Sequence, residues 1–412
     1  MIDTKKIGER IAILRKARGM TGENFAELLN VSPQAVSKWE TGKNLPETVL
    51  LPDISKILGV SIDSILIPVT YPVKLHLGGH YIDGLPWLRY GQLCDCTWAG
   101  SIKLLLDAIG VKASYSEIMG FSGACYFFAM KSNWCPSAAM LQIAYNPNVA
   151  LEQAVGVERA LFAPENRDIK VKEAISHGKP VMLIQPRVEM EWGVICGYTE
   201  DGRFYGRSYF DNLIPDAKDI FTNNEYFLAD SYPGADQSLV YFLKDRTAPI
   251  HLNEALKKSL EAAQWLYTTG NKHNNPEYAL GLSAYDVIID GLCRDDAGFA
   301  ALTQYSTTEN GILLLTQLID KRRAAKAFWI EKSQYLSTIN APKMRDVASI
   351  YADILSALDA VLPNDLIVST QNGFPYEAWS AEKRVQIADA LTICKQLEQK
   401  VVDIIADVLN HW

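Results

Sequence analysis

Residues 5–68 are divided into five short segments by residues that start or stop helices. These start and stop signals constrain the fold more than any other feature of the chain. Within the segments, apolar residues recur at helical spacing, as Ile7, Ile11 and Leu14 do in the first. Thr21 and Ser32 precede the second and third segments, where short hydroxyl side chains cap helix N-termini. The pattern predicts a five-helix domain over residues 1–68.

The third segment, SPQAVSKWETGKNLP at 32–46, has polar and apolar residues distributed as in a helix that reads DNA. Val36 and Trp39 form its predicted buried stripe, so the opposite side is expected to face solvent. A reading helix of this kind brings polar side chains near its N-terminus to base edges in the major groove. The residues that we expect to contact bases or phosphates are Thr21, Ser32, Gln34, Ala35, Ser37, Lys38, Lys43 and Asn44.

The charge distribution makes this end of the chain the one suited to a polyanion. Residues 1–43 carry eight Lys or Arg against five Asp or Glu, whereas the remainder carries 32 basic and 43 acidic residues. The net charge of −8 excludes a protein that coats nucleic acid over its whole surface. Any contact with DNA must therefore come from a local patch.

The N-terminal segment resembles the Cro/C1-type helix-turn-helix family, also called the XRE family. The resemblance is carried by the runs IGERI (7–11), FAELL (25–29), VSKWETG (36–42) and LGVS (58–61). It implies a transcriptional regulator that binds a double-stranded DNA operator, usually as a homodimer on an inverted repeat. Gly22 departs from the family pattern, in which glutamine is frequent and contacts a phosphate, so we expect weakened affinity. A five-helix domain used for protein or RNA contacts is the alternative.

The second region, residues 74–246, follows a proline-containing segment, 69–73, that we expect to be a linker. A helix is predicted to begin near Thr97. Three strand-like runs come later, GKPVMLI, WGVICGY and RFYGRSYF, and Glu200-Asp201-Gly202 between the last two is a strong hairpin signal. This pattern predicts a helix packed on an antiparallel sheet, an α+β arrangement.

Cys96 stands where the predicted helix begins, which makes it a candidate nucleophile because the helix dipole and free N–H groups stabilise a thiolate. Gln92, shortly upstream, is a candidate oxyanion donor. The region resembles the papain-like N-terminal domain of butirosin-biosynthesis-protein-H-like proteins. That resemblance implies a papain-like α+β domain in which the cysteine works with a histidine and an Asp or Asn, and Asp211 occupies a plausible third position.

The histidine is missing from its expected position, where Glu191 and Trp192 stand, and no histidine occurs from 178 to 250. We therefore expect a degenerate domain that binds a small-molecule or peptide effector without turnover. The residues expected to line its pocket are Cys96, Trp98, Glu191, Trp192, Tyr205 and Asp211. The alternative is a cysteine-dependent acyltransferase or peptidase-like enzyme in which His80 or His177 is recruited to Cys96.

Residues 250–412 carry almost no strand signal and predict an all-helical domain, with helices near 251–268, 277–293, 310–338, 342–361 and 379–409. In the last helix, apolar residues at alternating steps of four and three favour the core of a bundle over a dimer seam: Ala390, Cys394, Leu397, Val401, Ile404 and Val408. Arg322-Arg323 and the nearby lysines are expected on a solvated helix face. The fold class is therefore multidomain, α plus α+β.

The remaining sequence features concern metal binding, the redox compartment and the location of the protein. The spacing of Cys94, Cys96, Cys125 and Cys135 is not that of a usual zinc site, and we expect no metal and no cofactor. His76 and His80 are expected in a loop, and the aromatic run 126–128 in the core. Seven cysteines without a regular framework favour a reducing compartment. Because no apolar run is long enough to cross a bilayer, we expect a cytoplasmic protein.

Overall fold

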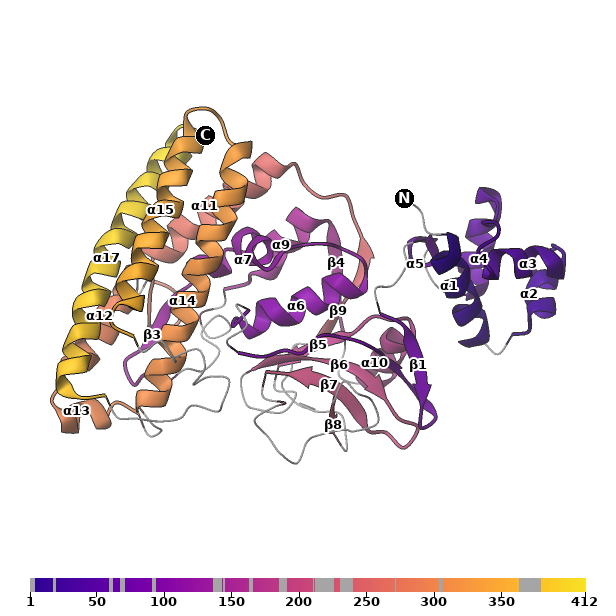
Figure 1. Ribbon diagram of the computed structural model, residues 1–412, viewed down its shortest axis with the longest axis horizontal. Coiled ribbons are helices and arrows are strands. Elements are labelled where there is room, and N and C mark those ends of the chain that lie inside the picture. Colours follow the sequence, from indigo (N-terminus) through magenta and orange to yellow (C-terminus); the bar gives the residue numbers. More distant parts are fainter. Residues whose placement is uncertain are drawn as a thin grey trace.

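The structure is a computed structural model, and the residues that it describes are 4–17, 20–58, 62–66, 71–90, 94–135, 143, 145–162, 166–184, 191–209, 211, 226–229, 240–270, 272–303, 307–362 and 379–412. Figure 1 shows a small helical unit at the N-terminal end, which we call the head (residues 4–66), and a larger body (residues 71–412). The head has its own hydrophobic core, and one continuous core runs through the sheet and the long helices of the body. The chain is thus multidomain and mostly helical.

The five predicted helices of the head are present: α1 Thr4–Ala17, α2 Gly22–Leu28, α3 Pro33–Glu40, α4 Leu51–Leu58 and α5 Ile62–Leu66. A short 3-10 turn, Thr48–Leu50, precedes α4. Val36 and Trp39 are buried, as predicted, and Asn30 ends the α2 segment with a φ of 54°. Asparagine tolerates this left-handed conformation better than most residues, which lets the chain turn sharply into α3.

The body contains an eight-stranded sheet whose strand pairs are antiparallel among the described residues. Its order is β1-β2-β6-β5-β9-β4, with β7 paired to β6 and β8 paired to β7. The bounds are β1 Val73–His76, β2 Gly79–Ile82, β4 Val157–Leu161, β5 Val181–Ile184, β6 Trp192–Tyr198, β7 Phe204–Ser208, β8 Phe227–Ala229 and β9 Val240–Arg246. The three predicted runs are β5, β6 and β7, and the predicted hairpin joins the last two.

The prediction that His76 and His80 lie in a loop is wrong, because they lie on β1 and β2 of a tight hairpin. Leu77 and Gly78 form the turn, with φ of 46° and 72°. Two successive residues at positive φ match the twist of a two-residue hairpin, and this is what brings the strands together. A leucine in that position is not a usual turn signal.

Helices pack against the sheet and connect it to the rest of the body. They are α6 Thr97–Ala108, α7 Tyr115–Phe121, α9 Asn148–Val155 and α10 Arg167–Ser176. The helix α6 begins at the predicted residue and packs on β5, β6 and β9, whereas α10 packs on β2, β5 and β6. Ser114 and Glu117 form a capping box at the start of α7. A 3-10 turn, Ala124–Tyr126, and strand β3, Ala129–Lys131, then lead away from α7.

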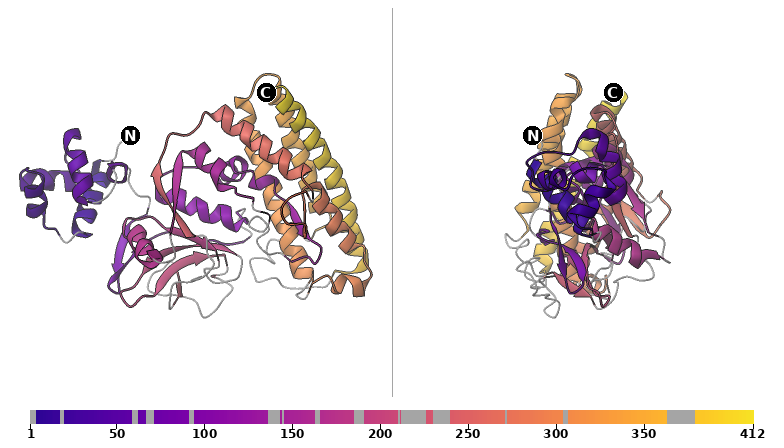
Figure 2. Two further views of the ribbon diagram at one scale, coloured as in Figure 1. Left: turned by 180° about the vertical axis from the view of Figure 1, so that it is seen from behind. Right: turned by 90° about the vertical axis from the view of Figure 1, so that its right-hand side faces the viewer.

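The C-terminal part of the body is a bundle (Figure 1 and Figure 2). Its helices are α11 Leu252–Thr268, α12 Leu282–Leu292, α13 Asp296–Ala300, α14 Thr307–Lys332, α15 Asn340–Asp359 and α17 Ala381–Asn410, with a 3-10 turn at Ser333–Tyr335. The predicted α17 stripe lies in the core, because α17 packs on α15, α12 and α11. Core residues in the run 126–128 are likewise as predicted.

Two predictions about the bundle are wrong. Residues 278–280, expected in a helix, form strand β10, Tyr278–Leu280, which pairs with β3. Local sequence does not reveal this pairing because the partner strand lies far away in the chain. Arg322, expected on a solvated face, is fully buried, where it pairs with Glu398 of α17 and donates to the Cys125 carbonyl at 2.7 Å. A buried partner of opposite charge makes that position possible.

Candidate functional site

The helix α3 is held against α1 by a close backbone approach and an ion pair. A Cβ atom on Gly8 would lie 2.0 Å from the Trp39 carbonyl oxygen, so only glycine allows this crossing. Arg15 of α1 donates to both carboxylate oxygens of Glu40, at 2.6 and 2.9 Å, and to the Met20 carbonyl. The hydrogen bond to Glu40 raises the pKa of Arg15. Bidentate pairing of this kind fixes geometry, so the C-terminal end of α3 is fixed on α1.

The face of α3 opposite this contact is open to solvent. Gln34, Ser37 and Lys38 are exposed and Ala35 is half-buried. Lys43 and Asn44 follow the helix, are also exposed, and have their backbone N–H groups bonded to the Lys38 carbonyl at 2.9 and 3.2 Å. The polar residues predicted to contact DNA on and after α3 are therefore gathered on one accessible surface.

The two predicted capping residues have the geometry of N-caps. The Thr21 hydroxyl accepts from the Asn24 N–H at 3.2 Å at the start of α2. The Ser32 hydroxyl accepts from the Ala35 N–H at 3.2 Å at the start of α3. Both side chains are exposed, and the first turns of α2 and α3 retain further backbone donors toward solvent. Such N-termini bind phosphate oxygens through N–H groups and the helix dipole.

A second candidate site surrounds Cys96, which is the N-cap residue of α6 and is 9% exposed. Its backbone N–H donates to the Tyr115 hydroxyl at 3.0 Å, and Tyr115 in turn donates to Asp320 Oδ2 at 2.6 Å. Close by, Tyr209 donates to the Cys94 carbonyl at 2.5 Å. The start of α6 is thus surrounded by residues of α7, of α14 and of the segment after β7.

Burial dominates the electrostatics of this site. It raises the pKa of the Cys96 thiol to about 11, and the N–H of Ala99 and the charge of Lys321 offset only part of the effect. Burial also raises the pKa of Glu191 to about 7, although hydrogen bonds with Thr97 and Tyr90 act in the opposite direction. Desolvation disfavours the charged form of acids, so the thiol is neutral at neutral pH.

The predicted pocket residues are only partly brought together. Glu191 and Trp192 lie beside the start of α6, and the Trp192 N–H is 3.5 Å from the Thr97 hydroxyl. Trp98 is turned toward α9, where its indole N–H donates to Asn148 Oδ1 at 3.2 Å.

The other two predicted pocket residues belong to different surroundings. The Tyr205 ring packs on the His76 ring, with centroids 6.2 Å apart. Asp211 accepts from the Ser208 N–H and hydroxyl at 3.0 and 2.7 Å, as a turn residue does. Gln92 lies outside the described residues.

Each histidine of the chain has surroundings of its own. His80 Nδ1 lies 2.9 Å from the Tyr198 hydroxyl, and burial lowers its pKa. His177 ends α10, and its carbonyl accepts from Arg10 at 3.0 Å. The other four are His76 beside Tyr81, His251 at the start of α11, His273 near Tyr278 and His411 near Asp407. The charged groups that act most on the Cys96 thiol are Lys321, Asp320 and Glu191, none of them an imidazole.

The sequence analysis did not identify Tyr115 and Asp320, which lie near Cys96, and its prediction that the lysines near Arg322 are solvated is wrong for Lys321. Tyr115 and Asp320 are 205 residues apart in the chain, so no spacing rule connects them. Lys321 is 6% exposed, and burial lowers its pKa to about 8. A lysine next to an arginine pair in a helix is usually solvated, and no local signal marks this one as buried.

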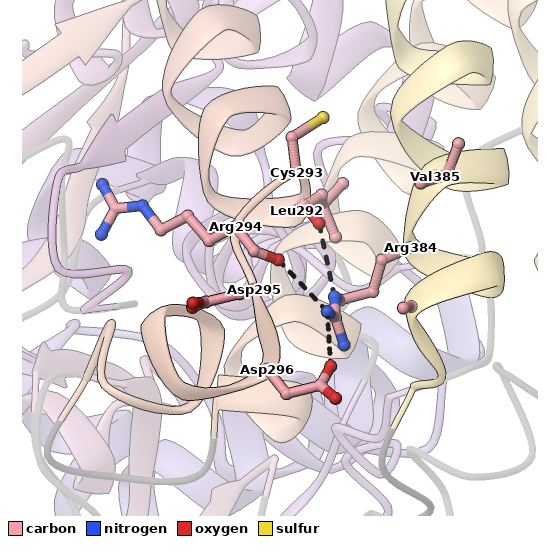
Figure 3. Close-up of a pocket in the computed structure, with 8 residues that line it drawn as sticks. Leu292, Cys293, Arg294, Asp295, Asp296, Arg384 and Val385 are labelled. Carbon is pink, nitrogen blue, oxygen red and sulfur yellow. Dashed lines mark hydrogen bonds and ion pairs between the residues drawn. The ribbon is translucent and has the colours of Figure 1, made fainter.

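An open pocket of about 430 Å³ lies elsewhere, at the end of α12 (Figure 3). Its central side chain, Arg384, donates to the Leu292 and Arg294 carbonyls at 3.3 and 3.2 Å and to Asp296 at 2.8 Å. These acceptors are backbone groups at a helix end and a carboxylate, so the guanidinium closes the α12–α13 corner. The pocket therefore has a structural explanation.

Three further findings concern metal, membrane and disulfide chemistry. In the part of the chain that the structure describes, three or more His, Cys, Asp or Glu side chains nowhere gather as a metal ion would require. The helices among those residues include none with the length and apolar character needed to span a bilayer. All seven cysteines are free thiols.

Residues 11–65 match a family model described as helix-turn-helix. The chain is 43% identical over 61 residues to the HTH-type transcriptional activator BcrR of Enterococcus faecalis, covering 15% of this chain and 30% of that protein. It is 34% identical over 61 residues to the uncharacterized HTH-type transcriptional regulator YazB of Bacillus subtilis (strain 168), covering 15% and 88%. It is 37% identical over 59 residues to the prophage-derived regulator YonR of the same bacterium, covering 14% and 55%.

The chain thus spans less than two thirds of BcrR and YonR but most of YazB. The matched residues, 11–65, coincide with the head, whose five helices carry the exposed polar face of α3. The predicted resemblance to the helix-turn-helix family is confirmed. This chain belongs, through its head, to the helix-turn-helix family of DNA-binding transcriptional regulators.

Proposed function

We propose that this chain is a one-component regulator in which α3 reads an operator and a degenerate papain-like region of the body binds a small-molecule or peptide effector without turnover. It acts as a homodimer on DNA. The exposed polar face of α3 supports the first part. The single observation that carries the second is the position of Cys96, buried at the start of a helix that packs on an antiparallel sheet.

Proton transfer explains why turnover is not expected. A cysteine nucleophile needs a base that takes its proton, or a lowered thiol pKa. Here the pKa of Cys96 is about 11, whereas those of Glu191 and Lys321 are about 7 and 8. Transfer of the thiol proton to either group is therefore uphill, and the resting thiol is a poor nucleophile.

The head and body are joined by a contact through which an effector could act. Arg10 of α1 is 3% exposed and donates to the His177 carbonyl, at the end of α10, at 3.0 Å. The same helix, α1, carries Gly8 and Arg15, which hold α3. An effector that favours one position of α10 would thereby favour one position of α3. The change in DNA affinity cannot exceed the difference between the effector's affinities for the two positions.

Alkylation of Cys96 tests the absence of an activated thiol. With a pKa of about 11, the iodoacetamide rate constant at Cys96 should rise about tenfold per pH unit from pH 7 to pH 10 without a plateau, because only the thiolate reacts. Mass spectrometry of peptides from the full chain measures the rate at each cysteine. The exposed Cys293 reports reagent quality in the same sample.

A plateau below pH 8 at Cys96, together with turnover of an acyl substrate, would contradict this part of the proposal and favour the cysteine-dependent enzyme. Cys94 must be quantified separately, because burial raises its pKa to about 12 and its slope should therefore resemble that of Cys96. Reaction at Cys96 that is slow and lacks a plateau supports a binding cleft.

Gly22→Gln should increase the affinity for DNA by about two- to tenfold, because the new amide can form one hydrogen bond to a phosphate. Gly22 is the first residue of α2, and a Cβ atom there would have no neighbour within 4 Å, so the longer side chain fits without displacing anything. Gly22→Ala is the matched control, since it adds helix propensity without an amide. Equal affinity of the two variants would remove α2 from the proposed interface.

A further inference from the structure

Lys321 is a buried lysine that has Asp320 and Cys96 as electrostatic neighbours. The residue is 6% exposed, and no hydrogen bond or ion pair joins its ammonium to another residue in the part of the chain described here. Its Nζ lies 5.2 Å from the centroid of the Phe127 ring. An ammonium removed from water without an acceptor is unfavourable, and buried charges in proteins normally have a partner.

The neighbours of Lys321 on α14, Asp320 and Arg322, both have side-chain partners. Asp320 accepts from the Tyr115 hydroxyl at 2.6 Å, and that hydroxyl accepts from the Cys96 N–H at 3.0 Å. Arg322 on the next position pairs with Glu398 and donates to the Cys125 carbonyl. These bonds hold α14 against the start of α6, so Lys321 is fixed beside the Cys96 thiol while its own donors remain unused.

The groups around Lys321 favour an anion with an apolar body. The Asp320 carboxylate already has its donor, and Glu191 is hydrogen-bonded with Thr97 and Tyr90. The N-terminal end of α6, with Cys96 as its N-cap residue, adds positive potential next to Cys96. The Phe127 ring lies beside the ammonium, and the Tyr115 and Tyr209 hydroxyls contact the backbone of Cys96 and Cys94. Sites that combine one charged group with aromatic side chains bind small organic ligands.

We propose that Lys321 binds the carboxylate of a small monocarboxylic acid whose apolar body lies against the aromatic rings beside Cys96. This inference rests on the proposed effector-binding function and names the class of its ligand. The bundle thus supplies the charged group of a site whose thiol comes from the sheet region, and the ligand completes the hydrogen bonding of the ammonium.

Isothermal titration of the full chain with hexanoate and with its neutral analogue hexanamide tests the assignment. We expect hexanoate to bind about tenfold or more tightly than hexanamide, because a charged hydrogen bond is gained. Lys321→Met, which keeps the length of the side chain, should abolish that preference. Lys326→Met, on the same helix but half-exposed, should leave it unchanged. Glu191→Gln should retain or strengthen hexanoate binding, since it removes a competing negative charge.

Equal binding of the two probes, absence of hexanoate binding, or a preference that survives in Lys321→Met would each overturn the inference. Weaker hexanoate binding in Glu191→Gln would also overturn it, because that result would assign recognition of the carboxylate to a protonated Glu191 rather than to Lys321. Operator affinity measured with and without hexanoate tests the proposed effector function separately from the ligand site. Lysine-dependent hexanoate binding that leaves operator affinity unchanged would contradict effector control while the site assignment stands.

Discussion

Replacing Gln34 and Lys38 together by alanine should weaken operator binding by about 1–3 kcal/mol for each residue that contacts a base. Both side chains are exposed on the face of α3 opposite the α1 contact, so they are free to reach a major groove. Their loss leaves the buried Val36 and Trp39 in place, and exposed substitutions of this kind change stability by no more than about 0.5 kcal/mol. Fluorescence anisotropy at one fixed salt concentration gives the affinities.

The duplex for this measurement is one selected from random sequences by the wild-type chain. Lys56→Ala is the matched control, because it removes an exposed basic charge from α4 without touching α3. If Gln34 reads a base, the double variant also loses discrimination at one operator position. Operator affinity in the double variant equal to that of the wild type would exclude this face of α3 as the reading surface.

Replacing Glu398 by leucine should destabilise the body by about 3–5 kcal/mol, because it leaves the Arg322 guanidinium buried without its anionic partner. Both side chains are completely buried, and Glu398 also accepts from the Tyr285 hydroxyl at 3.0 Å. Replacing both residues, Arg322→Met with Glu398→Leu, should recover most of the lost stability, since an apolar pair of similar volume needs no compensation. Urea unfolding followed by circular dichroism provides the free energies.

Glu382→Leu serves as the control for this pair, because Glu382 lies on the same helix, α17, with its side chain exposed. Its effect should stay within about 0.5 kcal/mol. A double variant as unstable as Glu398→Leu alone would mean that the cost comes from lost packing or from the Tyr285 hydrogen bond rather than from the unpaired guanidinium.

The head could be predicted from its sequence because its helix boundaries depend on neighbouring residues. Thr21 and Ser32 cap the helices that follow them, and Asn30 supplies a left-handed turn between them. Val36 and Trp39 share one face by helical spacing alone, which leaves Gln34 and Lys38 on the other. The reading face therefore follows from interactions only a few residues apart.

In the body, the predictions succeeded for α6 and the β6–β7 hairpin and failed for the β1–β2 hairpin and for β10. The β1–β2 hairpin is local, but its turn contains Leu77, which is not a usual turn residue, so its signal is weak. The strand β10 forms because it pairs with β3, which lies far away in the chain. Short strands with exposed or mixed faces give little alternation to detect. Sheet order, unlike helix position, is a property of the whole chain.

The surroundings of Cys96 show the same difference between local and distant interactions. The start of a helix at Cys96 was predicted from local sequence, and its position beside Glu191 and Trp192 was predicted from the resemblance to papain-like domains. The burial of that thiol and the placement of Lys321 beside it were not predictable, since they depend on α14, which folds onto α6 from more than 200 positions along the chain. Capping and helical periodicity act over a few residues and are written in the sequence, whereas desolvation of a charge depends on everything packed around it, and only the tertiary structure decided that.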